Sequence, residues 1–423
     1  MTDIFERLQL RRVINASGTE TPFGASPVRP EVVAAIVEII PHSVMMSELQ
    51  SAASEAICRA VGSEAGCVTG CTAAGIVIGV AACMTGRDLG RVEQLPDTTG
   101  MRNEVIMQKG HEITYGQNVS QNVRLAGARV VEIGAATQCG DYQLRHAITP
   151  HTVAAIYVVS PLTVQNRLID LETFCATCHE HGVPVIVDAA SVADPRRYVE
   201  SGADLVLFSA HKAFSSITAG IIAGRRELVQ ACISQEHGIG RPMKVGKEGV
   251  VGAIAALEAW LMDDRDAKRL ALSARLTRAK ARLERIAGLK VSIQGHQLML
   301  EINPTAARVS AHSLAKALRA QDPAIIVWNQ FAREGLLLLT LGKISDEVAD
   351  YVCDRIAEIC AADTVAEEPA PNIADAIAAQ LDERLTLKNV PAARHSAKGS
   401  DDDEPAHDRE YAGMTRAKTT HRV

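Results

Sequence analysis

Two residues with complementary chemistry follow neighbouring apolar runs near the middle of the chain. Asp188 comes directly after the run VPVIV, and Lys212 follows the next run, DLVLFS, 24 residues beyond the acid. Both runs have the composition of buried parallel strands, and ligands of such sheets sit at the carboxyl ends of the strands. A carboxylate and an amine at the ends of consecutive strands are therefore expected to face one site.

This pair predicts a site for pyridoxal 5'-phosphate. The cofactor needs a lysine amine for its Schiff base, and a carboxylate that keeps the pyridine nitrogen protonated so that the ring accepts electrons. Taken singly, such residues are more often a helix cap and a solvated loop lysine. Ser209 and His211 lie beside Lys212 and favour the interpretation as a site.

The cofactor phosphate needs an anion site, and the segment GCVTGCTAAGIVIGVAA offers one. The segment is typical of a strand, a turn at Gly70, Cys71 and Thr72, and a helix. Backbone N–H groups and the dipole at a helix start attract anions, and the hydroxyls of Thr69 and Thr72 add donors. The dinucleotide fingerprint G-x-G-x-x-G is absent here, which disfavours a nucleotide-dependent enzyme.

Two further features extend the predicted site. His111 follows a strand-like run, where its imidazole would lie on the cofactor ring; a buried loop histidine is the alternative. Arg241, Lys244 and Lys247 are spaced by three, so they would share one face of a helix and bind a cofactor or substrate anion. A solvated basic face is the alternative for these three residues.

One cysteine motif points to different chemistry. Cys175, Cys178 and His179 match C-x-x-C-H, the attachment pattern of c-type haem. They fall inside a predicted helix, Leu171–His181, between two core strands. We therefore expect buried cysteines there rather than haem, and no metal site.

Helices and short apolar strands alternate from about Ser47 onward, and these elements would position the site. The strands lack polar–apolar alternation, which is typical of strands buried on both faces. The strand candidates are Val105–Gln108, Arg129–Ile133, Ala154–Val159, Pro184–Val187, Asp204–Phe208 and Gly220–Ala223. The predicted fold class is α/β, a mostly parallel sheet covered by helices with a smaller α+β domain after it.

The chain divides into four predicted regions. Residues 1–44 form an N-terminal arm with one short helix, residues 45–255 the large cofactor-binding domain, and residues 256–362 the small C-terminal domain. Residues 363–423 shift to Ala, Glu, Pro, Asp, Lys and His. One short helix, NIADAIAAQLDERL, is predicted there, and the charged remainder is expected to be disordered because it has little to bury.

The composition of the chain bears on whether it binds nucleic acid, spans a membrane or is exported. The formal net charge is −6, whereas a generic nucleic-acid binder needs a basic surplus, so no nucleic acid is expected. Residues 65–86 are uncharged over 22 positions, but their glycines favour a strand, a turn and a buried helix over a membrane span. The N-terminal residues lack the apolar core of a signal peptide, and ten cysteines are too dilute for a disulfide scaffold. The expected location is the cytoplasm.

Several stretches together carry a resemblance to a known family. They are VINASGTETPFGAS, GSEAGCVTGCTAAGIVIGVAACMTG, QKGHEITYG with AGARVVEIG, the Asp188–Lys212 block, AGIIAG and GRPMKVGKEG. In these stretches the chain resembles the fold-type-I pyridoxal-phosphate enzymes related to L-seryl-tRNA(Sec) selenium transferase. Among them it looks most like the D-glucosaminate-6-phosphate ammonia-lyase-like members.

The resemblance implies a role for each residue of the site. Lys212 would carry the cofactor, Asp188 would hold the pyridine nitrogen, and His111 would stack on the ring. The phosphate would be held by Gly70, Cys71 and Thr72 together with Ser209. The stretch Asn15–Ser26 would form an arm near the active site, and two subunits would build each site in a homodimer or larger assembly.

The predicted function is a lyase that acts on a hydroxy-amino acid. In an α,β-elimination, Lys212 would remove the α-proton, a β-substituent would leave, and the products would be a 2-keto acid and ammonia. The basic residues at positions 241, 244 and 247 make an anionic or phosphorylated sugar amino acid plausible. A racemase or epimerase and an aldolase use the same chemistry and stay open as alternatives. Selenium transfer, or a fold that has lost catalysis, is less favoured.

Overall fold

The computed structural model describes residues 3–362 and 371–385. Residues 3–362 lie in one compact unit, and helix α16 (Ile373–Leu385) belongs to a second. This helix confirms the one predicted in the C-terminal region. The disorder predicted for the rest of residues 363–423 falls outside the described residues.

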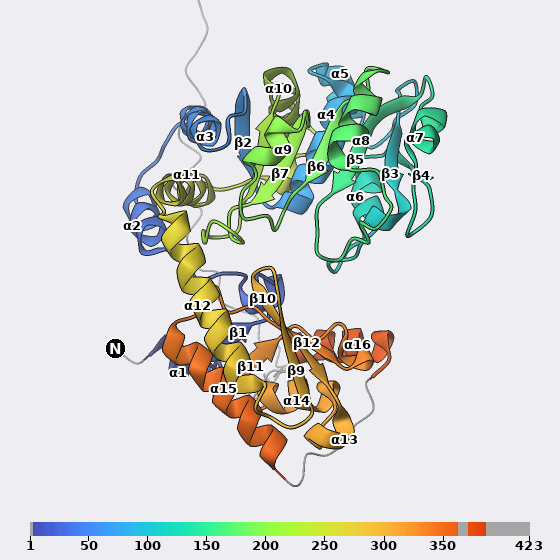
Figure 1. Cartoon of the computed structure of the whole chain (residues 1–423). Helices are drawn as coiled ribbons and strands as arrows, with labels where there is room; N and C mark the ends of the chain where they lie inside the picture. Colours follow the sequence, from blue (N-terminus) through green and yellow to red (C-terminus); the bar gives the residue numbers. More distant parts are fainter. Residues whose placement is uncertain (1–2, 363–370, 386–423) are drawn as a thin grey trace, which may run out of the picture. The chain divides into compact units, whose positions relative to one another are not determined.

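A seven-stranded sheet positions the residues predicted to do chemistry. Its strand order is β2-β8-β7-β6-β5-β3-β4. In Figure 1 the labelled strands run from β2 at the left through β7, β6, β5 and β3 to β4 at the right. The four strand pairs from β7 to β4 are parallel, while β8 runs antiparallel to both β2 and β7. The strands are β2 (Ala65–Thr69), β3 (Glu104–Gln108), β4 (Arg129–Ile133), β5 (Thr152–Val158), β6 (Val185–Asp188), β7 (Leu205–Ser209) and β8 (Gly220–Gly224).

Both faces of this sheet are buried, as the apolar strands predict. Along β6, Val185 and Val187 pack into one hydrophobic cluster and Ile186 into the other. The first cluster includes side chains of α3 and α11, and the second includes those of α4 and α10. The result is a three-layer α/β/α arrangement, so the predicted fold class is confirmed.

Helices α4 to α9 lie between strands of the sheet in the chain, whereas α2 and α3 precede its first strand and α10 and α11 follow its last. α4 is buried on nearly all sides, which explains its uninterrupted apolar sequence. The helices around this sheet are α2 (Pro30–Ile39), α3 (Met46–Val61), α4 (Thr72–Thr85), α5 (Leu89–Gln94), α6 (Val119–Leu125), α7 (Asp141–Ala147), α8 (Leu171–His179), α9 (Arg196–Glu200), α10 (Arg226–Ser234) and α11 (Lys247–Leu261).

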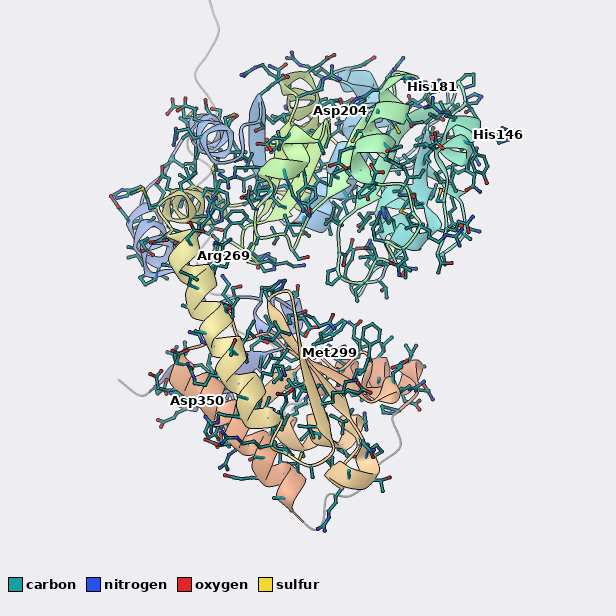
Figure 2. All side chains as sticks on the ribbon, viewed as in Figure 1. His146, His181, Asp204, Arg269, Met299 and Asp350 are labelled. Atoms are coloured by element: carbon teal, nitrogen blue, oxygen red, sulfur yellow. The ribbon has the colours of Figure 1, made fainter. Side chains whose placement is uncertain are left out.

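A third hydrophobic cluster packs around two smaller sheets. Antiparallel strands β12-β10-β9 form one, and β1 pairs with β11 in parallel to form the other. Figure 2 marks Met299 on β10, Asp350 on α15 and Arg269 on α12 in this part of the chain. The elements are β1 (Val13–Ala16), α12 (Arg265–Leu283), β9 (Leu289–Gln294), β10 (Gln297–Ile302), α13 (Pro304–Ala307), α14 (Ala311–Arg319), β11 (Ala324–Val327), β12 (Leu336–Leu339) and α15 (Asp346–Ala361), with α1 (Ile4–Arg7) preceding them.

Two details differ from the sequence expectations. β1 lies in a segment for which only turns and a short helix were predicted, and its partner β11 is about three hundred residues away in the chain. The domain boundary predicted at residues 255/256 falls inside α11. Within the part of the chain that the structure describes, no helix combines the length and apolarity that crossing a bilayer requires.

Candidate active site

The sheet brings the predicted residues to one edge through its strand register. Ser209 at the end of β7 lies opposite Gly220, and Gly220 lies opposite Thr69 at the end of β2. On the other side of β7, Asp188 pairs with Leu207. The ends of β2, β7 and β6 therefore place the turn after Thr69, the segment before Lys212, and Asp188 side by side.

Asp188 is a carboxyl in an apolar setting. Its side chain is buried, and the Ala190 N–H donates to its Oδ1 at 3.1 Å. Burial raises the pKa of Asp188 to about 6, against the opposing effects of that hydrogen bond and of the Lys212 charge. Such a carboxyl is stabilised as an anion by a cation placed against it, which a protonated pyridine nitrogen would provide.

Burial has the opposite effect on the pKa of Lys212. Burial lowers the pKa of Lys212, while the negative charges of Asp188 and Glu20 raise it. A lysine with a lowered pKa holds more of the free amine that reacts with an aldehyde. Two N-terminal residues reach this lysine: Glu20 by its charge, and Ser26 through a 2.7 Å hydrogen bond to the Lys212 carbonyl.

Unpartnered polar atoms lie where the phosphate was predicted. Thr72 Oγ1 and His211 Nε2 are buried without a hydrogen-bond partner among the described residues. The other ring nitrogen of His211, Nδ1, lies 2.9 Å from Ser209 Oγ. Buried polar atoms of this kind normally bond to something, so the residues present fit an anionic group here.

The turn from β2 to α4 also fits an anion, with one correction. Cys71 is the N-cap of α4, and its Sγ accepts a hydrogen bond from the Ala74 N–H at 3.4 Å. The N–H groups of Thr72 and Ala73, which precede it in the first turn, have no acceptor within the helix. Gly70 does not contribute such a donor, because its N–H bonds to the Met243 carbonyl at 3.1 Å. Thr69 Oγ1 bonds to the same carbonyl at 3.2 Å.

His111 lies directly after β3, in a short 3₁₀ turn (Lys109–His111), and is fully buried. Its Nδ1 accepts from the Val158 N–H at 3.2 Å, and its Nε2 lies 2.9 Å from Gln165 Oε1. These contacts require the neutral tautomer with the proton on Nε2, and burial lowers the pKa of His111. The ring packs edge-on against Tyr157, with centroids 4.4 Å apart.

Tyr115 is a nearby residue that the sequence interpretation missed. Its hydroxyl accepts a hydrogen bond from the Asn122 side chain. Burial of the hydroxyl, together with the charges of Asp188 and Cys71, raises the pKa of Tyr115 to about 12, so the phenol lies near both. It stays protonated at neutral pH. The one signal for Tyr115 in the sequence is its place shortly after His111, the residue predicted to stack on the cofactor ring.

The expected cationic helix face at residues 241–247 is wrong. Arg241 belongs to a 3₁₀ turn (Arg241–Met243), Lys244 follows it in extended conformation, and Lys247 begins α11. Pro242 and Gly246 interrupt the helix that the spacing assumed. The Lys247 ammonium bonds to the carbonyls of Ile40 and His42, so it caps the chain after α2. Arg241 and Lys244 are exposed.

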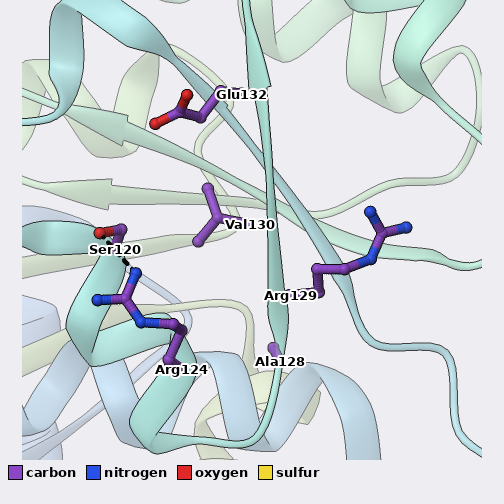
Figure 3. Close-up of a pocket in the computed structure, with 6 residues that line it drawn as sticks. All are labelled: Ser120, Arg124, Ala128, Arg129, Val130 and Glu132. Atoms are coloured by element: carbon purple, nitrogen blue, oxygen red, sulfur yellow. Dashed lines mark hydrogen bonds between the residues drawn. The ribbon is translucent and has the colours of Figure 1, made fainter.

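Two other features lie away from this edge. A hollow of about 490 Å³ is lined by Ser120, Arg124, Ala128, Arg129, Val130 and Glu132, none of which was predicted for the site (Figure 3). The cysteines of the C-x-x-C-H motif are buried in α8, and burial raises the pKa of each to about 12. His179 Nε2 lies 2.8 Å from Asp204 Oδ2.

Comparison with known proteins decides the family. The profile described as L-seryl-tRNA selenium transferase matches residues 13–336. The chain belongs to the L-seryl-tRNA selenium transferase family. A D-glucosaminate-6-phosphate ammonia lyase of Salmonella typhimurium is 34% identical, over 84% of this chain and 98% of that protein. A 5'-C-glycyluridine monooxygenase-decarboxylase of a Streptomyces species is 36% identical, over 84% and 91%.

Solved structures agree with this family assignment. The structure of D-glucosaminate-6-phosphate ammonia-lyase has a TM-score of 0.77 at 34% identity, covering 85% of this chain and 99% of that one. Serine palmitoyltransferase of Sphingomonas wittichii shares the fold, with a TM-score of 0.53 at 16% identity over 82% and 86%. The predictions of a fold-type-I enzyme and of pyridoxal phosphate as its cofactor are confirmed.

Proposed function

We propose that this family member is a pyridoxal-phosphate-dependent ammonia-lyase. Its substrate would be a hydroxy-amino acid, with a phosphorylated sugar amino acid as the leading class. The juxtaposition of Asp188 and Lys212 at the ends of β6 and β7 carries this proposal. It is supported by the match to nearly the whole length of the Salmonella ammonia lyase.

Each residue of the edge has a defined task in this reaction. Bound pyridoxal phosphate supplies an electron sink that acidifies the substrate's α C–H bond. Asp188 would keep the pyridine nitrogen protonated, and the start of α4 with Thr72, Ser209 and His211 would hold the phosphate. His111 is a neutral ring whose orientation is fixed by Val158 and Gln165.

Lys212 moves the proton in this proposal. Its free amine would take the α-proton and give a proton to the departing β-hydroxyl, which leaves as water. Water later displaces ammonia from the unsaturated product, so the net change is the loss of ammonia and formation of a 2-keto acid. Arg241 and Lys244 are exposed cations near the phosphate turn and would attract an anionic substrate.

We also propose a cytoplasmic homodimer or larger homo-oligomer. The ten cysteines are free, as expected in a reducing compartment. α2 exposes Val33 and Val37 at 48% and 64%, and Ile40 follows at 53%. An exposed apolar strip of this kind is typical of an interaction surface.

An ammonia-release assay tests the reaction. The protein reconstituted with pyridoxal phosphate is offered β-hydroxy-α-amino acids with and without a terminal phosphate, D-glucosaminate-6-phosphate among them, beside Lys212→Ala. Ammonia and a 2-keto acid in equal amounts, lost in the variant, are expected. Racemised substrate, an aldehyde product, or oxygen uptake with release of CO₂ would each contradict the lyase reaction.

A further inference from the structure

The loop that carries Lys212 is held at four consecutive backbone carbonyls by residues outside it. The Ser26 hydroxyl donates to the Lys212 carbonyl at 2.7 Å, and the Lys343 ammonium donates to the Ala213 carbonyl at 3.2 Å. Arg29 donates twice, from Nε to the Phe214 carbonyl at 3.2 Å and from its backbone N–H to the Ser215 carbonyl at 2.9 Å. Each of the four carbonyls from Lys212 to Ser215 is therefore restrained by a residue that is distant in sequence.

Arg29 is itself firmly anchored. Its two terminal nitrogens donate to the carboxylate of Asp263 at 2.9 and 2.6 Å, and both side chains are largely buried. A bidentate arginine–carboxylate pair fixes the plane of the guanidinium as well as its position. Because the guanidinium is fixed, its hydrogen bond from Nε also restrains the position of the Phe214 carbonyl.

Lys343 reaches the same loop from the segment between β12 and α15. Besides the Ala213 carbonyl, its ammonium donates to Ser215 Oγ at 2.7 Å. Ser215 has φ +58°, a left-handed conformation that costs a residue with a side chain about 1–3 kcal/mol. The hydrogen bonds from Arg29 and Lys343 hold Ser215 in that conformation.

We propose that Arg29 and Lys343 are positioning residues for Lys212. They fix the loop so that the Lys212 amine lies at the sheet edge beside Asp188. The inference rests on the proposed function through the role of Lys212 as the residue that carries the cofactor. It also means that the lysine's placement depends on the N-terminal segment and on the region after β12, neither of which adjoins it in sequence.

The test measures how fast pyridoxal phosphate attaches to the cofactor-free protein, read from its visible absorbance, together with kcat and KM. Lys343→Met is expected to slow attachment and lower kcat about fivefold, with KM within about twofold, because two acceptors lose the ammonium that donates to them. Lys343→Arg should restore most of the rate. Lys290→Met, which removes an exposed lysine paired with Glu301 on β9 and β10, serves as the matched control and should behave like the wild type.

A second variant keeps the inference testable if Lys343→Met folds poorly. Ser215→Ala removes only the hydroxyl that Lys343 bonds, and about a twofold slower attachment is expected. Attachment to both variants at the wild-type rate would overturn the inference. A wild-type protein that takes up no pyridoxal phosphate would instead overturn the proposed function, so the two failures are distinguishable.

Discussion

At the scale of single residues, Asp188 and Lys212 experience burial in opposite ways. Burial raises the pKa of the acid and lowers that of the amine, so it destabilises the charged form of each side chain. Burying the Asp188 charge lowers the stability of the cofactor-free protein, whereas the same buried charge favours binding of a cationic ring nitrogen. The stability of the cofactor-free protein should therefore improve when the acid is removed.

Asp188→Asn is expected to stabilise the cofactor-free protein at neutral pH. Because burial raises the pKa of Asp188 from 3.8 to about 6, its ionisation costs about 3 kcal/mol of folding free energy above pH 6. The advantage of the variant should shrink as the pH falls from 6 to 4, since the wild-type carboxyl then binds a proton. Urea unfolding of both proteins at several pH values measures it, and equal stability at pH 8 would contradict the argument.

Gln165→Leu is expected to change the tautomer and orientation of His111 while the protein still folds. The substitution leaves the buried Nε2–H of His111 without its acceptor, which costs about 1–3 kcal/mol. We expect weaker retention of pyridoxal phosphate and a pH profile of activity that differs from the wild type, because the tautomer is no longer held. Gel filtration followed by absorbance measures the retained cofactor; unchanged retention and pH profile would show that the contact does not position the ring.

At the scale of elements, the start of β8 determines the shape of the phosphate turn. A Cβ on Gly220 would lie 2.3 Å from the Cys71 carbonyl carbon and 2.7 Å from Thr72 N, so Gly220→Ala must shift this backbone. Overpacking of this kind costs about 1–3 kcal/mol, and cofactor binding should weaken roughly tenfold. Equilibrium titration with pyridoxal phosphate measures the change.

Gly75→Ala is the matched control for that experiment. It lies in α4, where an added Cβ would meet side chains of β7 and β8 at an ordinary 3.6 Å. Alanine also favours the helix over glycine by about 1 kcal/mol. Cofactor affinity should be unchanged, and a loss equal to that of Gly220→Ala would show that the effect is general destabilisation.

The sequence predicted the elements that its local pattern determines. The runs that became β6 and β7 are continuous and apolar, so both strands and the residues at their ends, Asp188 and Lys212, were predictable. Contacts made across long sequence separations were not: β1 with β11, Glu20 near Lys212, and Gln165 on His111. The prediction of a cationic helix face was wrong because the three-residue spacing was taken to indicate a helix, although Pro242 and Gly246 interrupt it.

At the scale of the whole molecule, the Arg29–Asp263 pair joins the N-terminal segment to the end of α11. The hydrogen bond from Arg29 is the largest cause that lowers the pKa of Asp263 to about 2 from 3.8, and Lys268 lowers it as well, so the ionised carboxylate with these two partners contributes about 2 kcal/mol of stability. That contribution is present above pH 4 and is lost as the pH falls towards 2. Asp263→Asn should therefore destabilise the protein at pH 7 and much less near pH 2.

Denaturant unfolding at both pH values measures this difference. Lys290→Met is a suitable control, because the Lys290–Glu301 pair is exposed and is expected to contribute little. A destabilisation by Asp263→Asn that is the same at both pH values would contradict the charge argument and indicate a packing effect instead.

The central claim is that Lys212 carries pyridoxal phosphate beside Asp188, and one measurement tests it most directly. The absorbance of the protein supplied with pyridoxal phosphate is recorded in the visible range before and after borohydride, beside Lys212→Ala, and the reduced protein is digested for mass spectrometry. We expect a visible band that borohydride removes, an adduct on Lys212, and neither in the variant. A protein that stays colourless, or an adduct on another lysine, would contradict the claim.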